Sequence, residues 1–539
     1  MEKSWYVYAK KADFGDISRR YGIDPVTARV LRNRDIIEDE DIRLFLEGSL
    51  EDLKDPMGLP DMKKAVELLY DAIREGRHIR IVGDYDIDGV CATYIMYRTL
   101  SVCGAWVDQV IPERIRDGYG INMRLIDEAE SEGVDVIVTV DNGIAAMEEL
   151  ARAKSLGMTV IITDHHDLRT DQEGGELIPP SDAAVDPKRD SCSYEGTRDI
   201  CGAMVAFRLS ELLLSRAGLG KEIWLELLPF AAIATVGDVM PLTGESRIVV
   251  REGLRAINEE RDRLNPGLQE LIKACGIDDR LINSYHIGFI IGPCINAGGR
   301  LETALSALKL FLCDDRTEAA ALAGHLRLLN DERKSMTEKG VEEAIKTVEV
   351  HYAHDLVLVV ELPWLHESLA GIVAGRLREH FGKPSFVLTD TDTEGISKGS
   401  GRSIEAYHMF QGLQKQQELL LRYGGHPMAA GLSLRTGDIG ELRLRLNREC
   451  SLREQDLIEK IWIDAPMPIS YVSERLIEEL EALAPFGNGN PRPLFAEKGL
   501  IAYDMKVLGK NKNVLRLSLR EEGRAPLQAV MFGDAQRLY

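Results

Sequence analysis

The sequence lacks the features that would place it in a membrane or mark it for export. No stretch of its 539 residues approaches the roughly 18 uninterrupted apolar residues of a membrane-spanning helix. The amino-terminal segment MEKSWYVYAKKADF has no apolar core of the kind found in signal peptides. We therefore expect a cytoplasmic protein with no membrane partner.

Paired cysteines are also missing. The eight cysteines are scattered, without a CxxC pair or a regular spacing, and several of them lie in apolar contexts. This pattern favours reduced thiols within the core over disulfides or zinc ligands.

The chain has no excess of positive charge, since 66 basic residues face 88 acidic ones and the net charge is −22. Such a balance argues against a protein that coats nucleic acid non-specifically. It leaves room for an enzyme that holds a polyanion in one basic groove, because affinity depends on the cations close to the phosphates. The length exceeds one ordinary core and predicts about two to four domains.

The organising stretch is His78–Tyr97, HIRIVGDYDIDGVCATYIMY, whose pattern predicts a strand, a loop and a helix. Its loop carries Asp84, Asp86 and Asp88, and carboxylates at every second position repel one another unless a hard cation lies among them. A solvated acidic turn is the alternative for this loop taken alone.

Two later apolar runs favour the cation. Val134–Val140 ends at Asp141, and Met158–Thr163 ends at Asp164, His165 and His166. Near-continuous apolar strands separated by helices predict a parallel sheet covered on both faces, with functional groups at the carboxyl ends of the strands. Carboxylates with imidazole suit manganese, magnesium or iron, so we predict a metal site at this edge.

Other segments are candidates for this site or for the substrate. Asp238 follows an apolar helical run and is either a turn residue or a further metal ligand. Arg114 and Tyr119 lie in a glycine-containing loop after a strand, which is either a phosphate or base contact or a plain connection. The segment Asn296–Arg300, NAGGR, is expected to begin a helix near Leu301. Its glycines would let the backbone approach an anion, which Arg300 would bind; a glycine-rich turn is the alternative.

Two further glycine-rich segments each carry one cationic or titratable group and suit a phosphate-contacting wall opposite the metal site. Ordinary glycine turns are the alternative. The candidate substrate contacts in them are Ser400, Arg402, Ser403, Gly425 and His426.

The order of patterns along the chain predicts an α/β protein with several parts. We expect an accessory segment over 1–60, a catalytic parallel-sheet domain over 61–315, a linker helix over 316–350, a smaller α/β domain over 351–460 and a strand-rich domain over 461–539. Closely spaced strands in the last part suggest a small β-barrel, for which an oligonucleotide-binding fold is one option.

The motifs resemble the DHH phosphoesterase family, and within it the exonucleases specific for single-stranded DNA. The resemblance covers nearly the whole chain in family order. It rests on GDYDIDG at Gly83–Gly89, VDNG at Val140–Gly143, DHH at Asp164–His166, GD at Gly237–Asp238, NAGGR at Asn296–Arg300, HESLAGIVAGRL at His366–Leu377, SGRS at Ser400–Ser403, GGHPMAAG at Gly424–Gly431 and PFGNGNPRPLF at Pro485–Phe495.

The resemblance implies a DHH lobe, a DHH-associated lobe and an oligonucleotide-binding barrel. It also implies two manganese or magnesium ions and 5′-to-3′ hydrolysis of single-stranded DNA in repair and recombination. Asp84, Asp86, Asp88, Asp141, His165 and Asp238 would then be metal ligands. The catalytic set adds Asp164 and His166, and His166 would either contact phosphate or orient a metal ligand. Val82 departs from the pattern, because some members carry a ligand histidine there. The barrel is expected to be incomplete or abbreviated, since the sequence stops at Tyr539.

Two rival functions follow from the same motifs. A DHH phosphodiesterase for short oligonucleotides or cyclic dinucleotides needs the metal site but no barrel, and the 461–539 region argues against it. A scaffold without catalysis would have lost carboxylates that are all present here. Single-stranded DNA is the expected partner, a helicase and a single-strand-binding protein are candidate protein partners, and we expect a monomer.

Overall fold

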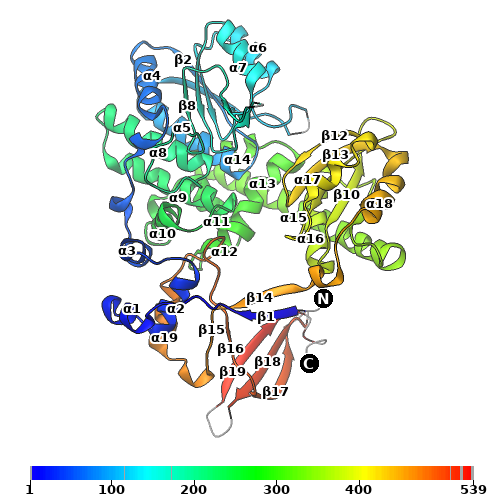
Figure 1. The fold of residues 1–539 in the computed structure, drawn as a ribbon. Helices are drawn as coiled ribbons and strands as arrows, with labels where there is room; N and C mark the ends of the chain where they lie inside the picture. The colour runs from blue at the N-terminus through cyan, green and yellow to red at the C-terminus, as the bar shows by residue number, and fades with distance from the viewer. Residues whose placement is uncertain are drawn as a thin grey trace. The chain divides into compact units, whose positions relative to one another are not determined.

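The computed structural model describes residues 3–114, 116–171, 173–509, 512–521, 526–533 and 535 (Figure 1). The chain divides into two compact units. The larger comprises 49–459 with 487–489, and the smaller comprises 3–48, 460–486 and the residues from 490 onward. None of the helices in the described ranges is long and apolar enough to cross a membrane.

The first half of the larger unit is built on a parallel five-stranded sheet in the order β3-β2-β4-β5-β8. Its strands are β2 (His78–Val82), β3 (Trp106–Val110), β4 (Val136–Val140), β5 (Thr159–Thr163) and β8 (Ala183–Val185). The predicted apolar runs therefore form the strands, each shortened by a residue or two at one end. All side chains of β2 and β4 are buried, as expected for strands with helices on both faces.

Successive residues of these strands point to opposite faces, so the sheet has two cores. Ile81 and Val138 pack into the larger core, whose helices include α4 (Met62–Arg74), α5 (Ile87–Val102), α8 (Gly202–Arg216), α9 (Lys221–Gly237) and α10 (Gly244–Glu259). Val82 and Ile137 pack into the smaller core beneath α6 (Met123–Ser131) and α7 (Met147–Ser155).

The prediction for NAGGR was wrong, because these residues do not precede a helix. They form the end of α13 (Gly292–Leu301), which follows a π-helical turn, η4 (Ile287–Ile291). The glycines allow close packing instead of a break: a Cβ on Gly299 would overlap the carbonyl oxygen of Tyr85, and one on Gly298 would lie 2.8 Å from the oxygen of Thr303. Helix α13 can therefore lie directly against the loop that follows β2.

A single helix, α15 (Arg316–Thr347), then leads into a second sheet, as the sequence predicted. This sheet has the order β12-β13-β11-β10-β9, with only β9 and β10 parallel. Its strands are β9 (Leu358–Glu361), β10 (Ser385–Asp390), β11 (Ile396–Arg402), β12 (Leu420–Gly425) and β13 (Ala429–Arg435). One face packs on α15 and α16 (Ala370–Phe381), and the other on α17 (Met409–Gln414) and α18 (Ile439–Arg448).

The glycine-rich segments of this lobe lie mainly in strands, which argues against the alternative that they are ordinary turns. Ser400 to Arg402 belong to β11, and Gly424 and Gly425 belong to β12. A Cβ on Gly401 would lie 2.5 Å from the sulfur of Met409, so the missing side chain makes room for α17.

The smaller unit joins the two ends of the chain. Strand β1 (Lys3–Val7) pairs with β14 (Glu459–Ile463), and Val30, Leu31, Ile42 and Phe45 share a core with Leu483. Three strands, β17 (Ile501–Leu508), β18 (Val514–Arg520) and β19 (Leu527–Phe532), form an antiparallel sheet at the predicted positions. The sequence did not reveal that residues 3–48 fold with the carboxyl-terminal part.

Candidate metal centre and its arginine wall

The loop after β2 places three carboxylates at the start of α5. Asp86 is the N-cap, and its Oδ1 accepts hydrogen bonds from the amides of Asp88 (2.9 Å) and Gly89 (3.1 Å). Asp84 accepts a bond from the amide of Gly120 at 3.3 Å. The capping position therefore fixes where this loop turns, and Asp84 and Asp88 are both 1% exposed.

Asp88 points to the beginning of α8. Its two oxygens accept hydrogen bonds from the amides of Gly202 (2.6 Å) and Ala203 (2.8 Å), which stabilise a negative charge at a helix N-terminus. A Cβ on Gly202 would lie 2.6 Å from the Cβ of Asp141, so glycine lets α8 begin against the site. Neither Gly202 nor Ala203 stood out in the sequence, because neither carries a reactive group.

Asp141 follows β4 in a left-handed backbone conformation, with φ of 61°. Such a conformation is uncommon for residues other than glycine, and Asp and Asn tolerate it best. The neighbouring Asn142 holds the turn, because its Nδ2 donates to the carbonyls of Val82 (3.0 Å) and Val140 (2.9 Å). Asn142 was part of a quoted motif, but its bridging of two strand ends required the structure.

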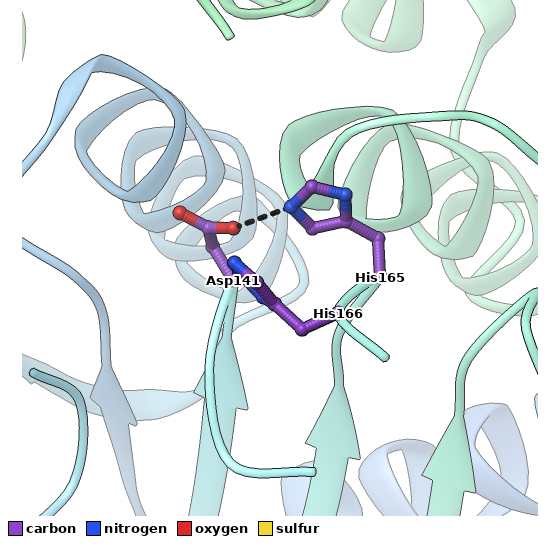
Figure 2. Close-up of side chains that lie close together, drawn as sticks. All are labelled: Asp141, His165 and His166. Carbon is purple, nitrogen blue, oxygen red and sulfur yellow. Dashed lines mark hydrogen bonds and ion pairs between the residues drawn. The ribbon is translucent and has the colours of Figure 1, made fainter. Parts of the chain in front are cut away.

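The two histidines after β5 face different partners (Figure 2). His165 Nε2 lies 3.0 Å from Asp141 Oδ1, 3.5 Å from Asp88 Oδ2 and 3.8 Å from Asp238 Oδ2. His166 instead makes a 2.7 Å contact from Nδ1 to Asp164 Oδ1. His165 therefore lies among the carboxylates of Asp88, Asp141 and Asp238, whereas His166 pairs with Asp164 and still lies within reach of Asp141.

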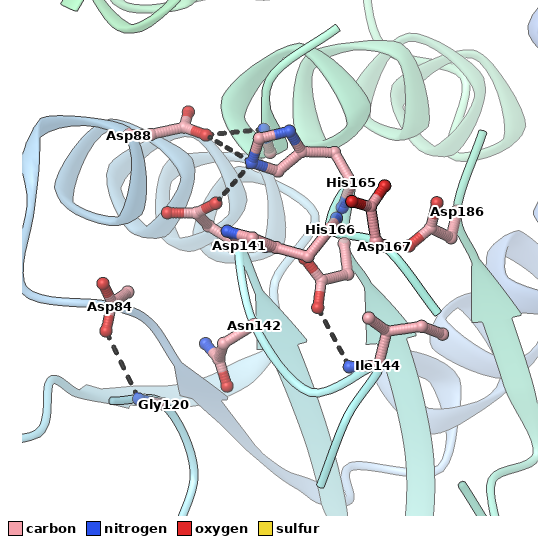
Figure 3. Close-up of polar contacts among 12 residues, drawn as sticks. Asp84, Asp88, Gly120, Asp141, Asn142, Ile144, His165, His166, Asp167 and Asp186 are labelled. Atoms are coloured by element: carbon pink, nitrogen blue, oxygen red, sulfur yellow. Dashed lines mark hydrogen bonds and ion pairs between the residues drawn. The ribbon is translucent and has the colours of Figure 1, made fainter. Parts of the chain in front are cut away.

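Asp164 serves as a support for the loop. It accepts hydrogen bonds from the amides of His165 (2.7 Å), His166 (3.3 Å) and Ile144 (2.9 Å), and Figure 3 labels these three residues. These bonds connect the ends of β4 and β5 and orient both histidines.

Three overlapping groups of side chains could each hold a metal ion. Within each group, one ligand atom from every member lies within 4.8 Å of the others. The groups are Asp84, Asp86 and Asp141; Asp88, His165 and Asp238; and Asp141, His165 and His166. All six ligands expected from the resemblance are thus brought together, and Asp141 and His165 are each shared by two groups. Val82 supplies no donor atom, and its side chain is buried beside α6 and α7.

The electrostatics of this pocket fit a cation. Burial and the charge of Asp86 raise the pKa of Asp84 to about 8, and burial and Asp88 raise that of Asp238 to about 8. Burial and neighbouring carboxylates also raise the pKa of Asp86 and Asp141. Asp238 Oδ2 is buried without a hydrogen-bond partner among the described residues. Clustered oxygens of this kind need a positive charge between them, so the residues present fit divalent ions.

Opposite this loop lies a set of arginines. Burial and the charges of Arg114 and Arg333 lower the pKa of Arg300 to about 10, and burial, Arg378 and Arg114 lower the pKa of Arg402. Within the described ranges, neither Arg300 nor Arg402 forms an ion pair. Arg300 donates to the carbonyl oxygen of Ser368 at 3.0 Å, and Arg402 donates to Ser400 Oγ at 3.0 Å. Arginine side chains without a carboxylate partner are able to bind phosphate or another anion.

Not all predicted substrate contacts lie in this wall. Asn296 Oδ1 accepts the amide of Ile87 at 2.8 Å and so holds the metal loop. Ser403 is buried and donates to the carbonyl oxygen of Tyr407 at 2.6 Å. Gly425 and His426 are exposed, and the charge of His426 acts on Asp167. Tyr119 is half-exposed and donates to the carbonyl oxygen of Asp141 at 2.9 Å.

Family models match three parts of the chain. The DHH family N-terminal domain matches 78–235, the DHHA1 domain matches 355–451 and the RecJ OB domain matches 463–539. The single-stranded-DNA-specific exonuclease RecJ of Escherichia coli is 32% identical over 500 residues, which are 88% of this chain and 83% of that protein. This chain belongs to the RecJ family.

Other members agree with this assignment. RecJ of Bacillus subtilis is 37% identical over 96% of the chain, which spans only 64% of that longer relative. The crystal structure of RecJ in complex with Mn²⁺ from Thermus thermophilus matches with a TM-score of 0.81 and 30% identity, covering 98% of this chain and 74% of that one. The predicted fold class is thereby confirmed, including the oligonucleotide-binding domain at the carboxyl-terminal end.

Proposed function

We propose that this protein is a metal-dependent exonuclease that hydrolyses single-stranded DNA from the 5′ end, acting in DNA repair and recombination. The observation that carries the proposal is the buried carboxylate–histidine cluster beside arginines that lack carboxylate partners. A site of this kind binds divalent cations on one side and a phosphate backbone on the other. Its RecJ relatives are exonucleases specific for single-stranded DNA.

Each of these side chains then has a proposed role in catalysis. Asp84, Asp86, Asp88, Asp141, His165 and Asp238 hold two Mn²⁺ or Mg²⁺ ions. When bound, such ions lower the pKa of a water molecule, orient the phosphate and stabilise the leaving oxygen.

His166 remains protonated at neutral pH, since Asp164 outweighs the effect of burial and raises its pKa to about 9, and it contacts the phosphate. Arg114, Arg300 and Arg402 neutralise the substrate charge.

The parts outside the catalytic lobe bind and place the strand. Our proposed domain limits lie at residues 60, 315, 350 and 460. The OB domain contacts the phosphate backbone of the strand through Lys506, Lys512 and Arg516. We assign the same role to Lys510, which lies outside the described residues. A helicase and a single-strand-binding protein are the proposed protein partners of a cytoplasmic monomer.

The test is digestion of a labelled single strand with Mn²⁺ present. We expect nucleotide release that is slowed far more by a bulky block on the 5′ end than by the same block on the 3′ end. A duplex of the same length and an RNA strand serve as comparison substrates. Equal loss from both ends, together with faster cleavage of di- or trinucleotides, would instead support the phosphodiesterase for short oligonucleotides or cyclic dinucleotides.

A further inference from the structure

Two cysteine thiols meet away from the metal centre. Cys275 ends α11 (Pro266–Ala274), and Cys294 lies in the first turn of α13. Their sulfur atoms are 3.7 Å apart, and both thiols are free. A disulfide requires about 2.05 Å between the sulfurs, so a shift of under about 2 Å would join them.

The position of Cys294 is fixed by the linker helix. Asn330 Nδ2 donates to Cys294 Sγ at 3.3 Å, and Arg333 Nε donates to Asn330 Oδ1 at 3.1 Å. Cys294 is fully buried, whereas Cys275 is partly exposed. A reagent from solution therefore reaches Cys275 first and finds Cys294 directly behind it.

The surroundings of Cys275 favour its thiolate. A hydrogen bond with Cys294 and the positive charges of Arg327 and Lys334 lower the pKa of Cys275. Cys103 is a contrasting partly exposed thiol, because burial raises its pKa to about 11. Since the thiolate is the reactive form, the two cysteines should differ in reactivity.

We propose that Cys275 and Cys294 form a redox-active dithiol, in which Cys275 reacts with hydrogen peroxide and Cys294 then closes an intramolecular disulfide. In the first step the Cys275 sulfur attacks one peroxide oxygen, the O–O bond breaks and the sulfur becomes a sulfenic acid. The other oxygen leaves as water after protonation. In the second step the Cys294 sulfur attacks the Cys275 sulfur, the S–O bond breaks, and the departing hydroxide takes the Cys294 proton. Two thiols are oxidised and one peroxide is reduced to water.

The disulfide would link α11 covalently to α13. Helix α13 carries Asn296, which holds the amide of Ile87, and Gly299, which packs on Tyr85. Oxidation thus fixes the helix that supports the metal loop.

The test is oxidation of the full chain with a small excess of hydrogen peroxide, followed by alkylation and peptide mass spectrometry without reductant. We expect two of the eight thiols to be lost, a linked peptide pair containing Cys275 and Cys294, and complete reversal by dithiothreitol. In the reduced chain at pH 7.5, we expect iodoacetamide to label Cys275 at least about tenfold faster than Cys103.

Two variants test whether the linked peptide pair specifically requires Cys275. Cys275→Ser should abolish the linked pair while preserving the melting temperature, because residue 275 is partly exposed. Cys103→Ser is the matched control and should still form the pair at the wild-type rate. A fully folded wild-type protein that gives no Cys275–Cys294 peptide, or that links other cysteines equally fast, would overturn the proposal. None of these measurements depends on nuclease activity.

Discussion

Asp141 Oδ1 and His165 Nε2, which follow adjacent strands of the parallel sheet, meet at 3.0 Å. This pair connects the group formed with Asp84 and Asp86 to the group formed with Asp88 and Asp238. Because each of the two residues is shared by two groups, loss of either should disturb both proposed ion positions. The Asp141 position is therefore the most direct test of the site.

Replacing Asp141 by Asn should reduce DNA hydrolysis by at least about a hundredfold, since outer partners of metal ligands alone are worth 10- to 100-fold. Asn tolerates the left-handed backbone at this position, so the fold should survive. Initial rates with Mn²⁺ and bound metal per chain check this. Asp392→Asn, at an exposed position, is the control variant. Near-wild-type rates with unchanged metal content would remove Asp141 from the site.

The metal-free protein should lose stability as pH rises. In the unfolded chain Asp84 and Asp238 titrate near 3.8, whereas in the fold their pKa values are about 8. Between these values the folded state binds more protons, so the free energy of unfolding falls as pH rises and levels off above about 8. Melting in EDTA at pH 5.5, 7 and 8.5 measures the effect.

Saturating Mn²⁺ should reverse that loss, because an ion present at 100 times its dissociation constant adds about 2.7 kcal/mol. The Asp238→Asn variant in EDTA should show a smaller decline with pH than the wild type. Parallel pH curves for both proteins would contradict the assignment of the decline to this cluster.

Asp164→Asn should shift the alkaline limb of the activity profile to lower pH. Asp164 outweighs the effect of burial to raise the pKa of His166 to about 9, and without its charge His166 would lose its proton near or below its ordinary value of 6.5. The wild-type rate should hold to about pH 9, while the variant should already decline by pH 7. Rates between pH 6 and 9.5 at saturating DNA and metal decide this, and unchanged metal content excludes a loss of ligands. Identical alkaline limbs would show that His166 does not act as a cation.

Arg402→Gln should weaken substrate binding without altering the metal centre. We expect KM for a single strand to rise by about tenfold, the range of one lost charge-assisted bond. The slope of log affinity against log salt should fall by about 0.7 for each phosphate contact removed. Arg376→Gln is the control, because Arg376 is exposed and pairs with Glu379 at 3.1 Å. Equal effects of both variants would mean that Arg402 has no special contact.

Deleting residues 499–539 should weaken binding to long single strands and spare a very short substrate at saturating concentration. This cut removes β17 to β19 and leaves β16 (Phe495–Ala496) and α19 (Glu474–Glu481) in place. A deletion from 461 should additionally destabilise residues 3–48, whose core includes Leu483. Rates on long and short strands at two salt concentrations, with melting curves for both truncations, test this. Equal loss of turnover on both substrates by the folded shorter truncation would make the OB domain part of the catalytic unit.

The sequence correctly predicted those structural features that depend on a local pattern of residues. Buried parallel strands read as apolar runs, and their carboxyl ends gather by geometry, so Asp84, Asp141 and His165 could be placed together without coordinates. The long helix α15 and the three strands β17 to β19 also followed from periodicity.

The features that could not be predicted correctly depend on contacts between segments that are distant in the sequence. Gly298 and Gly299 looked like the start of a helix, but they lie near the end of one, where Gly299 packs on Tyr85 of the metal loop and Gly298 packs on the carbonyl oxygen of Thr303. The amides of Gly202 and Ala203 that bind Asp88 carry no sequence signal. Nor could the pairing of β1 with β14, more than 450 residues apart, be inferred from either segment alone.

The contact between Gly299 and Tyr85 has a mechanical consequence. The two segments meet with no clearance for a single methyl group, so a displacement of α13 toward the loop cannot be absorbed at the joint. It must pass to Tyr85 and hence to the carboxylates on either side of it. This steric stop acts together with the hydrogen bond from the Ile87 amide to Asn296 Oδ1, so that α13, which also carries Arg300, is held against the acidic loop in two ways.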